Sequence, residues 1–417
     1  MIQKILMVGI AALVLGACNG EQEQVPSPEA VSVSTAQQED ALPVKIKNPP
    51  LTNVTPAEPL TLAPLIDTAG IAPCAYSSGT LAYSEYASWS TYDVAEMQGY
   101  VSGQEGRCGP VERKYGVDVV LKFMEYDPSI GAFAARQVDA VTITNGDTLG
   151  VATASDQPVV AVHATSTSYG ADRILVPKSV TGFAGLKALK CRGLEATVSH
   201  YNVEEVSRAN GVDPTGYTYA MMDPGAAAAA MKTNDPEAQC ISVWEPFAQD
   251  TLAARSDVHV LADSTAIPAE ILDLVVVHQA VLDRPHGKAF VLALIEAYYR
   301  VVADLEGPDS DNAHRRLGKK VTDLSAEQMR DVLTRSVLYR RPQWVVSLFT
   351  DGQTFPFPEG VTSPPLSKIM EKNVAWAKAH GVTKGADVTV GYGAKDAATN
   401  ASFRFDPTYV QAFMAQQ

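Results

Sequence analysis

Acidic and aromatic side chains recur where the chain is expected to leave a β-strand and enter a helix. The seven segments of this kind are residues 84–91, 126–130, 144–148, 197–202, 223–225, 244–247 and 267–273. None of the seven contains Lys or Arg. Their acidic, aromatic and imidazole side chains are Glu85, Asp127, Asp147, Asp223, Glu245, Glu270 and Asp273, with Tyr86, Trp89, Tyr126, His200 and Trp244. Ligands of open parallel sheets bind beyond the carboxyl ends of the strands, so we expect these segments to form one cleft.

The chemistry of the segments favours a cation or a neutral molecule rich in hydrogen-bond donors. Carboxylates offer charge-assisted acceptors, and aromatic faces attract cations. Helix N-termini could hold an anion, but the nearby carboxylates would repel it. Guanidine, urea and small amines fit this description. The expected ligand-binding residues are Glu85, Tyr86, Trp89, Asp127, Asn145, Asp147, Ser199, His200, Trp244, Glu245 and Asp273.

Structural roles compete with ligand binding for several of these side chains. Asp127 and Asp147 stand where a helix cap is expected, and an acid in the first turn is stabilised by the helix dipole. Asp223 precedes a proline, as turn residues often do. Trp89 and Trp244 could instead fill the core, because aromatic side chains pack interiors well.

The sequence carries no recognisable catalytic or metal-binding motif. It has no HExxH, no cysteine pair at zinc spacing, no GxSxG and no glycine-rich phosphate loop. Ser199 and His200 are adjacent at a turn, where side chains rarely face each other as they do in a catalytic triad. We therefore expect a protein that is not an enzyme and that needs no cofactor and no metal.

Apolar runs alternate with helical patterns along most of the chain, which predicts parallel sheets flanked by helices. The expected strands are residues 81–84, 117–125, 140–144, 159–163, 173–176, 194–198, 217–222, 241–244, 258–261 and 272–277. The expected helices are residues 91–98, 129–136, 203–210, 225–231, 246–254, 288–305, 325–337 and 365–380, with another opening at 182–186. This is an α/β protein, and its length favours two lobes, with the chain crossing between them near 165–176 and 262–272.

The N-terminus has the pattern of an export signal. The apolar run from Ile5 to Leu15 follows one Lys and is too short to cross a bilayer. Leu15-Gly16-Ala17-Cys18 resembles the processing box of bacterial lipoproteins, which implies a signal peptide over residues 1–17 and lipid, such as palmitate, on Cys18. Residues 18–71, rich in Pro, Gln, Glu, Ser and Thr, are expected to form a disordered tether.

Charge and cysteine usage agree with a protein outside the cytoplasm. The formal net charge of −14 excludes nucleic acid as a main partner, because such binding depends on Lys and Arg contacts to phosphates. Apart from Cys18, four cysteines remain, and an oxidising compartment favours disulfides. We expect the pairs Cys74–Cys108 and Cys191–Cys240, the latter at the edge of neighbouring parallel strands. Buried free thiols are the alternative.

Five segments resemble the solute-binding proteins of ABC importers for nitrate, taurine, aliphatic sulfonates and urea-like compounds. They are KYGVDV at 114–119, AFAARQVDAV at 132–141, ATVSHY at 196–201, IPAEILDLVV at 267–276 and RFDPTY at 404–409. They span about residues 80–409 and follow the family's order. The stretch from 306 is longer than usual and departs from the family around 307–320.

The resemblance implies a two-lobed periplasmic-binding-protein fold of type 2 with a two-strand hinge. Lobe I would comprise residues 72–172 and 265–417, and lobe II residues 173–264. Glu270 and Asp273 match positions that could serve the hinge instead of the ligand. The implied function is capture of a small polar solute for an ABC permease, by a monomer anchored through lipid in the bacterial cell envelope.

Two other functions stay open. A pyrimidine-synthesising enzyme of thiamine metabolism shares this fold, so an enzyme is conceivable by analogy. A lipoprotein that binds a solute and signals through a membrane partner, without transport, would have the same sequence features.

Overall fold

The computed structural model describes residues 60–67, 69–155, 157–351, 357, 361–397 and 400–417. The expected signal peptide, Cys18 and the greater part of the expected tether lie outside these residues. Within them, no helix combines the length and the apolar character that a membrane span requires.

The larger of two sheets has the strand order β14-β15-β6-β12-β5-β2-β4, with β13 paired to β6, in the part of the chain that is described. Strands β5, β6 and β12 are buried along their whole length, as expected of strands covered on both faces. Strand β12 runs antiparallel to both of its neighbours, β5 and β6. The strand bounds are β2 Ser78–Tyr83, β4 Asp118–Phe123, β5 Ala140–Thr144, β6 Val159–Ser168, β12 Leu272–His278, β13 Ser336–Leu338, β14 Val390–Tyr392 and β15 Phe403–Phe405.

The smaller sheet has the order β11-β7-β10-β8-β9. Its strands are β7 Arg173–Pro177, β8 Lys190–Gly193, β9 Thr218–Met221, β10 Cys240–Val243 and β11 Val258–Asp263. The chain passes from β6 into β7 and returns from β11 to β12, where the two crossings were expected. We call residues 173–263 the small lobe, and the residues that carry the larger sheet the large lobe. The expected two-lobed α/β fold is confirmed.

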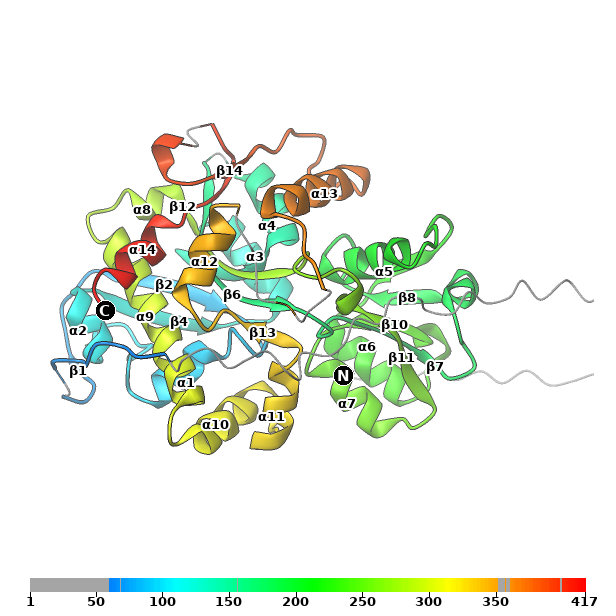
Figure 1. Ribbon diagram of the computed structural model, residues 1–417, viewed down its shortest axis with the longest axis horizontal. Coiled ribbons are helices and arrows are strands. Elements are labelled where there is room, and N and C mark those ends of the chain that lie inside the picture. The colour runs from blue at the N-terminus through cyan, green and yellow to red at the C-terminus, as the bar shows by residue number, and fades with distance from the viewer. Residues whose placement is uncertain (1–59, 68, 156, 352–356, 358–360, 398–399) are drawn as a thin grey trace, which may run out of the picture. The chain divides into compact units, whose positions relative to one another are not determined.

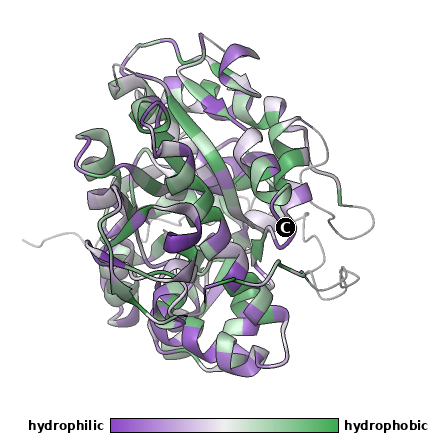
Figure 2. Ribbon diagram, turned by 90° about the vertical axis from the view of Figure 1, so that its left-hand side faces the viewer, coloured by the Kyte–Doolittle hydropathy of each residue, from purple (hydrophilic) through white to green (hydrophobic). Residues whose placement is uncertain are grey.

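Helices cover the sheets, and Figure 2 shows hydrophobic strands inside a layer of helices of mixed hydropathy. The small lobe contains α5 Val198–Ala209, α6 Pro224–Lys232 and α7 Phe247–Ala254, with a 3-10 turn at Phe183–Ala188. The large lobe contains α1 Thr91–Met97, α2 Pro110–Tyr115, α3 Tyr126–Ala134, α4 Asn145–Ala154, α8 Gln279–Leu282, α9 Gly287–Glu306, α10 Ser310–Thr322, α11 Ala326–Leu333, α12 Pro342–Phe349, α13 Leu366–Ala379 and α14 Thr408–Met414. The long helix α9 contacts α1, α2, α10 and α14, and α13 lies against α4 (Figure 1).

One expected strand is wrong, and the ends of several other elements differ from the expected bounds. The helix expected from residue 203 begins at Val198, and the strand expected to end at residue 163 continues to Ser168. Residues 194–198 form no strand. The strand of this region is β8, which ends at Gly193, and Ala196 has a φ of 58°, in the left-handed region that a strand cannot contain. Leu194 and Val198 are buried, but Glu195 between them is exposed, and Val198 already begins α5. The helix expected over 325–337 ends at Leu333, and β13 follows it.

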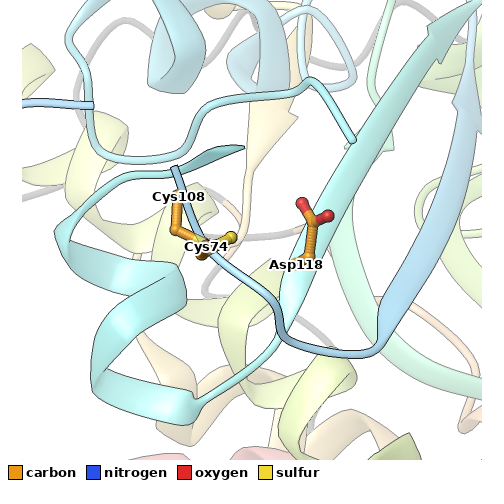
Figure 3. A group of neighbouring side chains, drawn as sticks. All are labelled: Cys74, Cys108 and Asp118. Atoms are coloured by element: carbon orange, nitrogen blue, oxygen red, sulfur yellow. A yellow bond between two sulfur atoms is a disulfide. The ribbon is translucent and has the colours of Figure 1, made fainter. Parts of the chain in front are cut away.

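Both expected disulfides are present. Cys74 and Cys108 lie 5.8 Å apart at Cα, where the short strands β1 (Ala72–Pro73) and β3 (Arg107–Cys108) pair. Asp118 lies beside this bridge (Figure 3), but the joined sulfurs offer no thiolate for a metal. Cys191 and Cys240 are direct neighbours in the register of β8 and β10, 4.4 Å apart at Cα.

The expectation of a disordered tether up to residue 71 is wrong for its last part. The backbone N–H of Leu60 donates to Glu306 (3.0 Å), and Arg300 donates to the carbonyl oxygen of Ala63 (2.6 Å). Leu60 and Leu62 also pack against the hydrophobic core. Leucine contacts of this kind offset the entropy of ordering the segment, which its overall polar composition did not suggest.

Removing the bridge within the small lobe should destabilise the protein. The Cys191–Cys240 disulfide closes a loop with a sequence separation of 49. The chain-entropy relation assigns about 4 kcal/mol to a loop of this length. We expect a Cys191→Ala/Cys240→Ala variant to lose up to that amount of unfolding free energy in guanidinium titrations. A Cys18→Ser variant is the control. Equal stability of all three proteins would contradict the expectation.

Candidate functional site

A small cavity lies where the strand ends of the two lobes meet. We call it the aromatic cavity, and its lining is Tyr86, Trp89, Tyr126, Thr144, Asp172, Val198, Trp244, Ile271 and Asp273. The volume that the centre of a water molecule can occupy within it is about 10 Å³. This is room for roughly one water. A larger ligand therefore requires the lobes to move apart, and the structure shows a closed arrangement.

All of the lining residues except Asp172 belong to the seven segments singled out in the sequence. Tyr86 and Trp89 follow β2, Tyr126 begins α3, and Trp244 directly follows β10. Asp172 precedes its strand, β7. Because β7 runs antiparallel to β10, the start of β7 lies at the carboxyl end of β10. A rule based on carboxyl ends of parallel strands could not find this residue.

Four aromatic side chains enclose the cavity. The rings of Trp89 and Tyr126 stack with centroids 5.4 Å apart, Trp244 meets Tyr126 edge-on at 5.6 Å, and Tyr86 lies 5.0 Å from Trp89. The indole nitrogens of Trp89 and Trp244 are buried, and neither has a hydrogen-bond partner among the described residues. A buried N–H without a partner costs free energy, and both of these residues line the cavity.

Two buried carboxyl groups, from Asp172 and Asp273, belong to the same lining. Oδ2 of Asp273 accepts a hydrogen bond from Oγ of Ser166 at 2.5 Å. Burial raises the pKa of Asp273 well above its ordinary value, and the charge of Asp172 adds to this effect. Burial likewise raises the pKa of Asp172 to about 7. Within the described residues, neither carboxyl group forms an ion pair, so a bound cation would remove the cost of ionising them.

Asp147 joins the lobes and occupies a helix N-terminus. Its carboxylate accepts hydrogen bonds from Tyr126 Oη (2.7 Å), from Thr144 Oγ1 (2.9 Å) and from the backbone N–H of Val198 (3.1 Å). Val198 is the first residue of α5, so the positive end of this helix already has an anion. The cap of α4 is the side chain of Thr144, not that of Asp147. Burial raises the pKa of Asp147 to about 6, against these three hydrogen bonds.

Glu245 is not free to bind a ligand. It is fully buried and pairs with the guanidinium groups of Arg173 (3.1 Å) and Arg335 (3.0 Å). Its other oxygen accepts the N–H of Gln249. No Lys or Arg lines the aromatic cavity, as the seven segments suggested. Arg335, which neutralises Glu245, comes from a part of the chain that these segments do not include.

A second basic residue comes from α13. Nζ of Lys372 lies 2.7 Å from Glu270 and 2.7 Å from Glu205 on α5. Tyr201 Oη also donates to Glu270 (2.7 Å). A second small cavity adjoins the aromatic cavity here, lined by Thr144, Asn145, Gly146, Asp147, Thr197, Val198, Tyr201, Glu270, Ile271, Asn373 and Trp376. Helix α13 thus connects the large lobe to α5.

The remaining predicted ligand residues lie away from the aromatic cavity. Asp127 is exposed in the first turn of α3. Glu85 does not line the cavity either, although burial raises the pKa of its carboxyl group to about 7. Asn145 lines only the second cavity and uses its amide to hold the backbone of Glu270 and Leu272. The other two are Ser199 and His200. Ser199 is buried in α5, and His200 faces Glu204.

Comparison with known proteins identifies the fold. No model of a protein family matches the chain, and no curated protein matches it. Among solved structures, the chain is similar to the sulfonate-binding protein SsuA from Methylobacillus flagellatus KT, with 15% identity over 82% of this chain and 94% of that one and a TM-score of 0.56.

Two further solved structures are similar. SsuA from Xanthomonas axonopodis pv. citri, bound to MOPS, has 14% identity over 75% of this chain and 95% of that one (TM-score 0.54). The aliphatic sulphonate binding protein SsuA from Escherichia coli has 15% identity over 73% and 92% (TM-score 0.53). Sulfonate importers are within the family that the sequence resembles. At such identities the likeness shows the periplasmic-binding-protein fold.

Removing the Lys372 ammonium should weaken the connection between α13 and the small lobe. A Lys372→Met variant leaves Glu205 and Glu270, both largely buried, without this cation, and we expect a loss of about 1 kcal/mol of unfolding free energy. The matched control on the same helix is Lys368→Met, whose partner Glu371 is as exposed as the lysine itself, so its effect should be near zero. Equal losses in urea titrations would contradict this role of Lys372.

Proposed function

We propose that the protein is the extracytoplasmic solute-binding component of an ABC importer and captures a small cation or donor-rich molecule in the aromatic cavity. The fold supports this role, because the similar structures named above are described as binding proteins. The position of the cavity supports it too, since a ligand between the lobes contacts both and favours a form in which the lobes close on it. Lipid on Cys18 would hold the protein near a permease in the membrane of the bacterial cell envelope.

The main observation behind the proposed ligand class is that Asp172 and Asp273 line the same cavity as four aromatic side chains. Each carboxylate can accept charge-assisted hydrogen bonds from an ammonium or guanidinium group, and the faces of the rings attract the same cation. A sulfonate or nitrate would meet two carboxyl groups instead. The N-terminus of α5, which could otherwise bind an anion, already donates a hydrogen bond to Asp147.

The two indole N–H groups narrow the ligand further. A molecule with an acceptor oxygen between its N–H donors, as in urea, would satisfy Trp89 and Trp244 together with the carboxyl groups. Guanidine and small amines would satisfy the carboxyl groups alone. The ligand class is therefore a small nitrogen compound with several N–H donors.

Ligand binding should depend on Asp273 and not on Asp127. We expect guanidine, urea or methylamine to raise the melting temperature of the full chain and to bind in calorimetric titrations. Asp273→Asn removes a charged acceptor, which is worth about 1.5–3 kcal/mol, or roughly 10- to 100-fold in Kd. Asp127→Asn, at the exposed site predicted only from sequence, is the control and should bind like the wild type. Preferential binding of taurine or nitrate would overturn the proposed ligand class.

The affinity for a cation should rise with pH. The raised pKa values of Asp172, about 7, and of Asp273 mean that cation binding expels protons at acidic pH. The Kd for guanidinium should therefore fall between about pH 5 and pH 8, by up to tenfold per pH unit for each proton released. Urea is uncharged, so its Kd should change little. A guanidinium affinity that does not vary with pH would show that neither carboxyl group pairs with the ligand.

A further inference from the structure

Two histidines and one glutamate face each other outside the aromatic cavity. His200 and Glu204 lie one turn apart on α5, so they share a face of that helix. His380 follows the end of α13. Oε1 of Glu204 lies 3.1 Å from Nε2 of His380 and 3.5 Å from Nε2 of His200. The donor atoms of all three residues lie within 4.8 Å of one another.

The hydrogen bonds of His380 indicate which of its two ring nitrogens carries the hydrogen. Nδ1 of His380 lies 2.9 Å from the carbonyl oxygen of Trp376, which can only accept, so Nδ1 carries a hydrogen. In the neutral ring the lone pair is then on Nε2, which faces an oxygen of Glu204. At 3.1 Å these two electron-rich atoms need a proton or a metal ion between them.

We propose that His200, Glu204 and His380 bind a divalent transition-metal ion of the Zn²⁺ type. Imidazole nitrogens and a carboxylate oxygen are common ligands of this ion. Ligands at 2.0–2.1 Å from a tetrahedral metal lie roughly 3.3 Å from each other, and the two observed separations lie on either side of this value. The fourth position is left for water.

The surroundings hold the three ligands in place. The other oxygen of Glu204, Oε2, accepts from Nε1 of Trp376 (3.1 Å) and from Arg208 (3.0 Å), which leaves Oε1 for the metal. The ring of His200 stacks on Tyr219 with centroids 4.3 Å apart. Fixed outer contacts of this kind orient metal ligands and raise affinity. The ligand side chains are 13–21% exposed, so an ion can reach them from solvent.

One contact opposes the proposal. Nδ1 of His200 accepts a long hydrogen bond, 3.4 Å, from the N–H of Ala196. Metal binding through Nε2 moves the ring proton to Nδ1 and breaks this contact. A neutral hydrogen bond contributes only about 1 kcal/mol, whereas zinc sites in proteins provide several times that amount.

The metal would connect the small lobe to α13. Two of its ligands come from α5 and the third from the end of α13, so the ion stabilises the arrangement in which these helices meet. It would act beside Lys372, which pairs with Glu205 on the same helix. The site does not depend on which solute enters the aromatic cavity.

The test uses the full chain with Cys18→Ser, so that no thiol remains outside the disulfides, purified without a polyhistidine tag. Zn²⁺ is titrated against a chromophoric chelator, and Co²⁺ is followed by its visible absorption. We expect one ion per chain, a tetrahedral Co²⁺ spectrum and a rise in melting temperature with Zn²⁺. His380→Ala should weaken Zn²⁺ binding by more than about 100-fold and abolish the rise. Glu204→Gln should also weaken binding.

The matched control is His286→Ala, which removes an exposed histidine at the start of α9. It should bind Zn²⁺ like the parent protein. The melting curve of each variant in EDTA reports whether it folds without metal. Absence of a tetrahedral Co²⁺ spectrum in the parent protein would overturn the proposal, and so would equal Zn²⁺ affinity of the parent and a folded His380→Ala variant.

Discussion

The closed arrangement depends on how the protein accommodates buried acids where its lobes meet. An ionised carboxylate removed from water costs several kcal/mol unless it gains a cation or hydrogen bonds. Glu245 gains two guanidinium groups, Glu270 gains an ammonium group and a phenol, and Asp147 gains three hydrogen-bond donors. Asp172 and Asp273 gain no cation from the described residues. The ligand proposed for the aromatic cavity is the group that would complete this set.

The same contacts decide what opening the lobes requires. Separating them breaks the hydrogen bond from Val198 to Asp147, the pair of Arg335 with Glu245 and the pair of Lys372 with Glu205. Each contact joins the small lobe to a residue of the large lobe. Since the aromatic cavity has room for roughly one water, solute exchange requires this opening. A ligand must then supply enough differential binding energy to favour closure.

The C-terminal part of the large lobe contributes more to this junction than its sequence suggests. Arg335 precedes β13 and reaches Glu245, and α13 supplies Lys372, Trp376 and, at its end, His380. The other contacts between the lobes include Asp147 with Val198, Tyr126 with Trp244 and Glu270 with Tyr201. The region therefore provides both positive charge and a candidate metal ligand at the junction.

The sequence by itself determined the local features of this protein. Apolar runs identified most strands, and strand ends followed by acids and aromatics identified nearly all of the aromatic cavity, because both depend on short-range pattern. The expected pair of Cys191 with Cys240 is correct although the strand expected after Cys191 is not, because Cys191 lies in β8 directly beside Cys240 of β10. The tertiary structure decided which acids are neutralised. Arg335 neutralises Glu245 across a separation of 90 residues, which no local pattern encodes. In the same way the tertiary structure brings the ring of His200 against that of His380, 180 residues away. It also placed Asp172 in the cavity, because the direction of β7 is set by its partner β10 and not by its own residues.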